Sequence, residues 1–267
     1  MRPLLVAAFT AATIACGNVG YAIHVAVWVD NNNANNADTF INSIFGAGSA
    51  IRVSMANLET PGFLSPFDAF FATSSANRVG SGLTAAAAAN VVSYVGTNAS
   101  RGTIVLFPGD WTDMLAGPAR PDPDDPHIDK LFANAVSLAT ASGHGYIGEF
   151  NGAAMAMDAN SDSLRPLHLV SGTAGHLSDF SDSVDTVSLT SVGAGQTIVS
   201  GVSFPFSPIE NSTFRTAIAG APTGDVIASW ADGVPAIIVS QVPEPTTAAL
   251  LLLGILSCIW HRHHRQV

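Results

Sequence analysis

Short apolar runs alternate with amphipathic segments along the first 150 residues of the chain. Residues 24–29 form a near-continuous apolar run that ends at Asp30, and a second run covers residues 50–55. Between them Asp38 is placed to cap a helix with four apolar residues on one face, namely Phe40, Ile41, Ile44 and Phe45. This order predicts a strand, a helix and a second strand.

The same alternation continues to about residue 150. Apolar runs at 67–72, 102–107 and 146–150 predict three further strands. A helix entered at Thr84, with Val91, Val92 and Val95 facing inward, and a helix over 128–142 lie between them. Continuous apolar strands separated by helices are typical of a parallel sheet covered on both sides. We therefore expect a three-layer, flavodoxin-like, mostly parallel sheet with helices on both faces.

The later part of the chain is less regular. Residues 168–170, 186–189, 226–230 and 236–239 read as strands, and Asp232-Gly233 is a tight-turn signal between the last two. We expect a closing hairpin there, and one α/β domain over residues 23–241. The body resembles class I glutamine amidotransferase-like and trehalose-utilisation-like α/β folds. The resemblance lies in the order and sequence character of its elements, including this hairpin and Phe107-Pro108-Gly109-Asp110. The nucleophilic cysteine of those families has no counterpart here.

The amino-terminal segment has the features of a secretory signal peptide. Arg2 is followed by an uncharged run over residues 4–15, and Gly20-Tyr21-Ala22 places small residues at positions −3 and −1 of a cleavage site. We predict that residues 1–22 direct export through the Sec machinery and that signal peptidase cuts after Ala22. An alternative stays open, because residues 13–16 loosely resemble a lipoprotein motif in which Cys16 is lipidated.

The carboxyl-terminal segment, residues 242–267, combines three parts in a fixed order. Val242, Pro243, Glu244, Pro245 and Thr246 form an extended, proline-interrupted motif. Residues 246–260 then form an uncharged run that spans about 22 Å as a helix, against a hydrocarbon core of about 30 Å. Residues 261–265 are rich in arginine and histidine. We predict a short transmembrane helix with a cytoplasmic basic end, which leaves the body outside.

These three parts together resemble the PEP-CTERM sorting domain of Gram-negative bacteria. The histidines among residues 261–265 depart from the purely basic end of that family. The resemblance implies export across the inner membrane, anchoring there by the helix, recognition by an exosortase-type membrane enzyme and cleavage near the Pro-Glu-Pro triplet. It also implies delivery to the cell surface or the extracellular space, commonly alongside exopolysaccharide, so that exopolysaccharide or other envelope components are expected partners.

Composition and charge narrow the possible functions of the body. Hydrophobic residues make up 48% of the chain and charged residues 11%, a balance typical of a folded protein. Once Arg2, Glu244, Arg262 and Arg265 are set aside, residues 23–241 hold 7 basic and 19 acidic residues, a formal net charge of −12. The basic residues are scattered singly, which argues against a nucleic-acid partner.

The positions of the cysteines exclude thiol chemistry and disulfides from the body. The chain has two cysteines, Cys16 and Cys258, and both lie in the terminal segments. Residues 23–241 therefore contain no cysteine nucleophile, no thiolate metal ligand and no disulfide. Stability in an oxidising compartment must come from the core.

Candidate chemistry in the body is sparse. If the parallel sheet is correct, Asp30, Asn31, Ser74 and Asp110 converge at the carboxyl ends of its strands, where open α/β sheets bind ligands. Acidic residues crowd the stretch 122–129, where a divalent cation is an alternative to an ordinary solvated loop. The pattern assigns no catalytic residue, no cofactor and no metal ligand.

Three functions from different classes are compatible with these features. The favoured one is an exported, non-catalytic protein of the cell surface or extracellular matrix. An exported hydrolase or carbohydrate-active enzyme is the alternative, and it requires paired carboxylates or a catalytic triad in one pocket. A membrane-retained binding or sensory module is the third.

Overall fold

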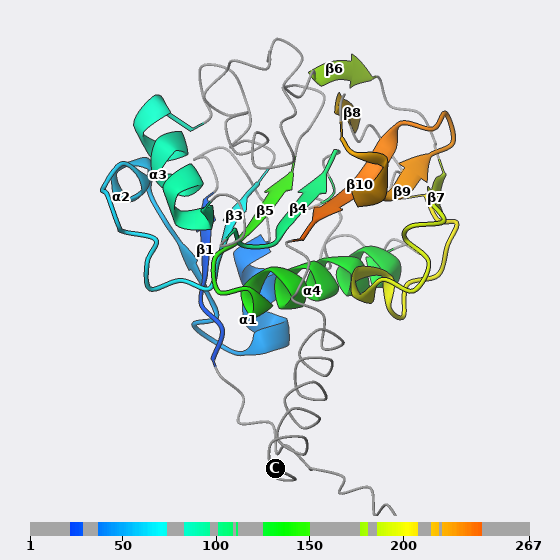
Figure 1. Cartoon of the computed structure of the whole chain (residues 1–267). Helices are drawn as coiled ribbons and strands as arrows, with labels where there is room; N and C mark the ends of the chain where they lie inside the picture. Colours follow the sequence, from blue (N-terminus) through cyan, green and yellow to red (C-terminus); the bar gives the residue numbers. More distant parts are fainter. Residues whose placement is uncertain are drawn as a thin grey trace, which may run out of the picture.

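The computed structural model describes residues 22–28, 37–73, 83–96, 101–108, 111, 125–149, 177–180, 186–207, 215–218 and 221–241 (Figure 1). Five strands and four helices come first: β1 (Val25–Trp28), α1 (Ala37–Phe45), β2 (Ala50–Arg52), α2 (Met55–Leu58), β3 (Ala69–Ala72), α3 (Ala85–Val95), β4 (Ile104–Phe107), α4 (Asp125–Ala141) and β5 (Gly145–Glu149). After them come β6 (Leu177–Phe180), β7 (Val187–Leu189), η6 (Thr197–Val199), β8 (Arg215–Ile218), η7 (Thr223–Asp225), β9 (Val226–Trp230) and β10 (Pro235–Ser240).

An eight-stranded mixed sheet forms the centre of the molecule, in the order β2-β1-β3-β5-β4-β10-β9-β7. The first five strands in that order are mutually parallel, and β10, β9 and β7 add to them through antiparallel pairs. The prediction of a mostly parallel α/β sheet is therefore confirmed. Flavodoxin-like sheets follow the order 2-1-3-4-5, so this sheet shares the first three positions and exchanges β4 with β5.

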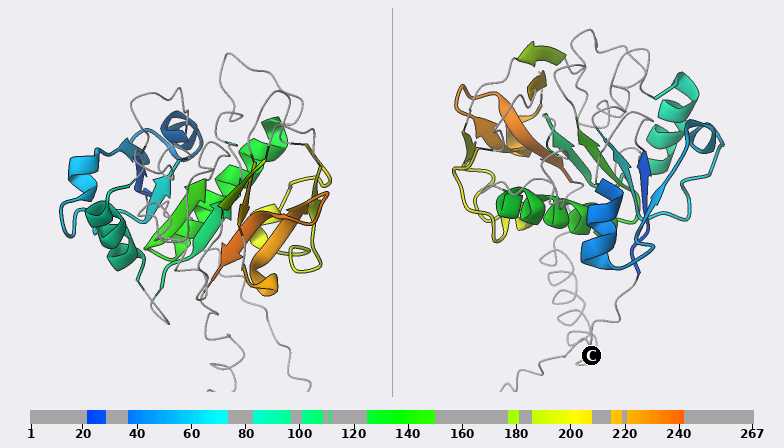
Figure 2. Two further views of the ribbon diagram at one scale, coloured as in Figure 1. Left: turned by 90° about the horizontal axis from the view of Figure 1, so that it is seen from above. Right: turned by 180° about the vertical axis from the view of Figure 1, so that it is seen from behind.

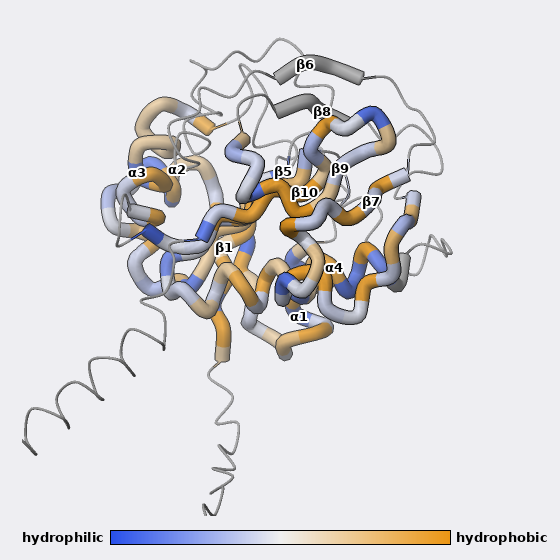
Figure 3. Tube along the Cα trace, turned by 45° about the vertical axis from the view of Figure 1, so that its right-hand side comes forward, coloured by the Kyte–Doolittle hydropathy of each residue, from blue (hydrophilic) through white to orange (hydrophobic). Residues whose placement is uncertain are grey.

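Helices cover both faces of this sheet (Figure 2). Side chains alternate between the faces along each strand, so Val25 and Val27 join one buried cluster with α1, α4 and η6. Ala26 and Trp28 join a second cluster with α2 and α3. The strands at the centre of Figure 3 are coloured as hydrophobic, in line with strands buried on both sides. The expected three layers are present in the described residues.

Capping residues explain where two helices begin. The Thr84 hydroxyl accepts a hydrogen bond from the Ala87 N–H at 3.2 Å and starts α3, as predicted. Ser54 forms a capping box with Asn57 and starts α2, a helix that was not predicted. The strand predicted over residues 50–55 ends at Arg52 instead. The buried Val91 and Val95 of α3 confirm the predicted inward face.

Two predictions about α1 are wrong. Asp38 does not cap the helix, because α1 begins at Ala37, and the Asp38 carboxylate instead pairs with Arg52 of β2 at 2.7 Å. Ile44 was expected on the buried face but is 54% exposed, whereas Ile41 is fully buried. The helix packs beside β2, the outermost strand of the sheet, so the apolar face of the helix is wider than the surface that covers it.

The ion pair between Asp38 and Arg52 makes stability depend weakly on pH. Burial acts to raise the pKa of Asp38, but the hydrogen bond and charge of Arg52 outweigh it and hold that pKa below its ordinary value. A carboxyl group whose pKa is lowered by folding stabilises the protein above its unfolded pKa and loses that effect as pH falls through the folded pKa.

For a surface pair of this kind we expect Asp38→Asn to cost at most about 1 kcal/mol at pH 7. The cost should shrink as the pH falls below the ordinary pKa of an aspartate and through the lower pKa of folded Asp38, because the protonated carboxyl and the Asn amide are then both neutral. Urea unfolding of the two proteins across this pH range measures the effect. Arg52→Gln combined with Asp38→Asn should cost little more than either change alone. A cost that does not shrink down to the lowest pH at which the protein stays folded would show that the pair is not its source.

The second half of the chain extends the sheet. The hairpin predicted around Asp232-Gly233 is confirmed: β9 and β10 pair in antiparallel fashion, and Gly233 has a positive φ of 85°. The predicted strand near residue 187 is β7, whereas residues 168–170 lie outside the described residues. β6 and β8, which the pattern did not predict, form a separate two-stranded sheet.

Among the described residues, none of the helices combines the length and the apolar character needed to cross a bilayer. The predicted segment 246–260 lies outside them.

Candidate functional site

The carboxyl ends of the parallel strands meet at one edge of the sheet, as the prediction of a ligand crevice requires. Trp28 of β1 pairs with Ala72 of β3, and Ala72 pairs with Gly148 of β5. The four side chains predicted to converge there lie outside the described residues: Asp30, Asn31, Ser74 and Asp110. The backbone brings the strands before Asp30 and Ser74 side by side. It separates the strand before Asp110 from them, because β5 lies between β3 and β4.

Glu149, the last residue of β5, occupies that intermediate position. Its side chain is fully buried, and among the residues whose side-chain burial is described it is the one charged residue with this property. The carboxylate accepts a short hydrogen bond from the backbone N–H of Trp111, which follows β4. A buried carboxylate is tolerated only when hydrogen bonds replace its hydration. Glu149 therefore ties the chain after β4 to the end of β5.

A cluster of aromatic rings adjoins Glu149 on the α4 face of the sheet. Trp111 meets Trp230 edge to face at 5.7 Å between ring centroids, and it also contacts Phe107 and Phe206. Phe107 stacks on Phe132 of α4 at 4.4 Å. This cluster joins β4, β9, α4 and the segment after η6. Trp111 lies at the centre of this cluster, and the hydrogen bond from its N–H to Glu149 thus holds its backbone in place.

Replacing Glu149 with Gln tests this anchoring role. We expect Glu149→Gln to lower the free energy of unfolding by about 2 kcal/mol, because a charge-assisted hydrogen bond is lost and a buried amide donor is introduced. Glu59→Gln is the matched control, since the Glu59 carboxylate also accepts a hydrogen bond, from the Thr84 hydroxyl at 2.9 Å, but is exposed. Its cost should stay below about 0.5 kcal/mol. Equal costs in urea unfolding would contradict the assignment.

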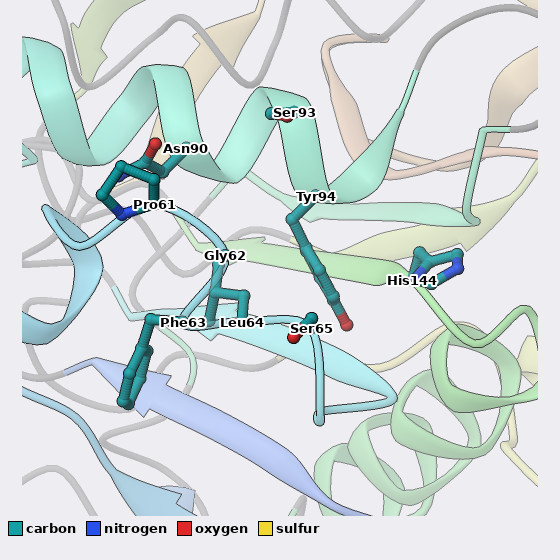
Figure 4. Close-up of a pocket in the computed structure, with 9 residues that line it drawn as sticks. All are labelled: Pro61, Gly62, Phe63, Leu64, Ser65, Asn90, Ser93, Tyr94 and His144. Atoms are coloured by element: carbon teal, nitrogen blue, oxygen red, sulfur yellow. The ribbon is translucent and has the colours of Figure 1, made fainter.

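A groove of about 300 Å³ opens at the opposite, amino edge of the sheet, between α3 and the loop before β3 (Figure 4). We call it the amino-edge groove. Tyr94 projects from α3 across it toward Ser65, with His144 beyond the ring. No lysine, arginine, aspartate or glutamate is among its lining residues, which are Pro61, Gly62, Phe63, Leu64, Ser65, Asn90, Ser93, Tyr94 and His144.

Tyr94 is held in place by both ends of its side chain. Its hydroxyl donates a hydrogen bond to the Phe67 carbonyl at 2.9 Å, and its ring meets His144 edge to face at 5.5 Å. Burial, reinforced by the negative charge of Asp68, raises the pKa of the Tyr94 hydroxyl well above its ordinary value. The ring is therefore a neutral, fixed wall. The groove suits a ligand with a neutral, partly apolar surface.

The described residues contain no cluster of three or more histidine, cysteine, aspartate or glutamate side chains arranged to hold a metal ion. His127 and Asp129 of the acidic stretch belong to α4, whereas Asp122 and Asp124 lie outside the described residues. The His127 ring packs against Phe206 at 5.9 Å, and its Nδ1 faces the Ser203 N–H at 3.4 Å. These contacts explain His127 as part of the packing between α4 and the segment after η6.

Comparisons with known proteins add no relative. None of the protein-family models, curated proteins or solved structures compared with this chain matches it. Its function is therefore argued from its own residues.

Sequence reasoning missed Glu149 and the amino-edge groove for different reasons. A single acidic residue ending an otherwise apolar strand was a visible signal for Glu149, although its partner, Trp111, depends on the order of the strands. No local pattern marked the groove, because Ser65, Tyr94 and His144 come from three separate elements.

Proposed function

We propose that this chain is an exported protein of the cell surface or extracellular matrix, with a non-catalytic α/β body and a carboxyl-terminal segment that is a substrate for an exosortase-type enzyme. The observation that carries the proposal is the position of the two ends of the body. Val25 begins β1 at the amino edge of the parallel sheet. Ser240 ends β10 at that same edge, because it pairs with Ile104, the first residue of β4.

This arrangement suits a protein handled at a membrane through both terminal segments. Only two residues, Ile23 and His24, separate the exposed Ala22 from β1, so cleavage after Ala22 leaves the sheet intact. One residue, Gln241, separates the end of β10 at Ser240 from the start of the sorting segment at Val242. With both segments at the amino edge, the carboxyl edge faces away from the membrane, toward envelope components such as exopolysaccharide.

The core supports export into an oxidising compartment. Residues 23–241 contain no cysteine, and two buried apolar clusters, one on each face of the sheet, take the place of disulfides. The described residues also favour binding over hydrolysis. A hydrolase of the paired-carboxylate type needs two acidic groups facing one substrate, whereas Glu149 is enclosed and holds the backbone of Trp111.

Expression of the full chain in a Gram-negative host with and without an exosortase-type enzyme tests the proposal. We expect the chain to be retained at the inner membrane without the enzyme. With it, the chain should reach the outer surface or the medium with a mass that corresponds to loss of residues 1–22 and of the end beyond the Pro-Glu-Pro triplet. Replacing Pro243, Glu244 and Pro245 with alanine should abolish the second cleavage, whereas Thr247→Ala should not. An uncleaved chain in the cytosol would refute the proposal.

A further inference from the structure

The amino-edge groove lies close to the point where the sorting segment leaves the body. In the register of β10 and β4, Gln241 follows Ser240 beside Thr103. Gly102, which precedes Thr103 in the chain, packs closely against the turn before β5. A Cβ atom added to Gly102 would lie only 2.1 Å from the carbonyl oxygen of His144. His144 lines the groove. Two strand spacings, about 10 Å, therefore separate Gln241 from the groove.

The residues after Gln241 are long enough to cover that distance. Val242 and Glu244 each precede a proline, which favours the extended backbone. A polyproline II segment rises about 3.1 Å per residue, so residues 242–246 span about 15 Å. A segment of that length would bring the Pro-Glu-Pro triplet to the near end of the groove, at Tyr94 and His144, without detaching from β10.

The wall of the groove has the chemistry that binds such a segment. Proline rings in an extended backbone pack against aromatic walls, at a low entropic cost because the segment is already stiff. Tyr94 presents a fixed ring with the imidazole of His144 at its edge, and the ring of Pro61 lies farther along the groove, beside Asn90. The Tyr94 hydroxyl is engaged by the Phe67 carbonyl, so the ring does not rotate away.

Charge is complementary at the start of the segment. The Arg101 guanidinium donates a hydrogen bond to the Ser240 hydroxyl at 2.8 Å, which places a positive charge beside the end of β10, where the negative charge of Asp225 also acts on it. Glu244 is the sole acidic residue after residue 241. An extended segment that turns toward α3 carries Glu244 past Arg101.

We propose that the amino-edge groove binds the chain's own sorting segment, residues 242–246, and holds the Pro-Glu-Pro triplet against the body. Docking of this kind orients the triplet relative to the membrane and makes the processing enzyme compete with the groove for it. That consequence for sorting rests on the proposed function. The docking itself does not, because it involves only this chain.

Disulfide trapping tests the docking directly, because the body has no cysteine of its own. In the full chain with Cys16→Ala and Cys258→Ala, Ser65→Cys places a thiol in the groove and Thr246→Cys places one in the segment. The unprocessed protein is purified in detergent from a host that lacks the processing enzyme. The rate of intramolecular disulfide formation under mild oxidation is then followed by mass and gel mobility.

The controls keep the same cysteine pair, since a short tether alone gives an effective concentration in the millimolar range. Adding Pro243→Ala and Pro245→Ala, or adding His144→Ala on the exposed rim of the groove, should slow disulfide formation at least fivefold. Circular dichroism verifies that each variant keeps its fold. Rates within twofold of the parent would overturn the proposal, as would a disulfide-linked dimer as the main product, which would assign the groove to a second copy.

The outcomes separate this inference from the proposed function. Fast trapping in a chain that is never exported or cleaved would leave the docking standing and refute the sorting role. Slow trapping in a chain that is exported and cleaved normally would refute the docking and leave the sorting role standing.

Discussion

Replacing Trp111 with alanine is expected to lower the free energy of unfolding by about 3–5 kcal/mol, the usual cost of removing a fully buried tryptophan. Trp111 is completely buried and contacts Phe107, Phe206 and Trp230. Its loss opens a cavity where the loop after β4 meets β9. For a body of this size the melting temperature should fall by about 6–20 °C, as measured by circular dichroism.

Two controls separate packing from other effects of this change. Trp111→Phe keeps an aromatic ring and removes an indole N–H that has no hydrogen-bond acceptor in the described structure, so it should cost clearly less than alanine. Leu189→Ala removes a large apolar side chain that is 37% exposed on β7 and should change stability by no more than about 1 kcal/mol. If Trp111→Ala were as mild as Leu189→Ala, the aromatic cluster would not be a centre of the core.

The second large effect is expected from adding a single methyl group at Gly145. This glycine begins β5, and a Cβ there would lie 2.3 Å from the carbonyl oxygen of Ala139 in the last turn of α4. Backbone atoms cannot give way as a flexible side chain does. We expect Gly145→Ala to cost about 3 kcal/mol, at the upper end for overpacking, because α4 must move away from the sheet.

Gly224 provides the matched control for this prediction. A Cβ on Gly224 meets no atom within 4 Å, and its backbone is not in the left-handed region. Gly224→Ala should therefore be neutral, or stabilising by up to about 1 kcal/mol, because alanine restricts the unfolded chain. Chemical denaturation of both variants measures the contrast. Similar midpoints would mean that α4 and β5 are not in the close contact described here.

Most of the elements up to β5 were predictable because their signals are local. A short apolar run bounded by polar residues favours a strand, and Thr84 starts α3 through a hydrogen bond only three residues along the chain. The turn at Asp232-Gly233 is local in the same sense. The strand assigned to residues 50–55 was too long because the capping box of Ser54 and Asn57, also a local signal, was overlooked.

The candidate site was less predictable, because its parts are distant in sequence. Asp30, Asn31, Ser74 and Asp110 were chosen because each follows the carboxyl end of a predicted parallel strand, and the order of the strands was not predicted. β5 lies between β3 and β4, so the strand that precedes Asp110 is displaced by one position and Glu149 occupies the gap. The exposure of Ile44 is a similar case, since periodicity identifies an apolar face but not how much of it the sheet covers.

Taken alone, the sequence determined the class of the body as an alternating α/β chain without cysteine, and it predicted the two terminal sorting segments, because each of these depends on composition or on spacings of a few residues. Only the tertiary structure decided the strand order, the partner of Glu149, the amino-edge groove and the exit of both ends of the body at one edge. These depend on which distant segments pack together, and that choice is made by the burial of the whole core.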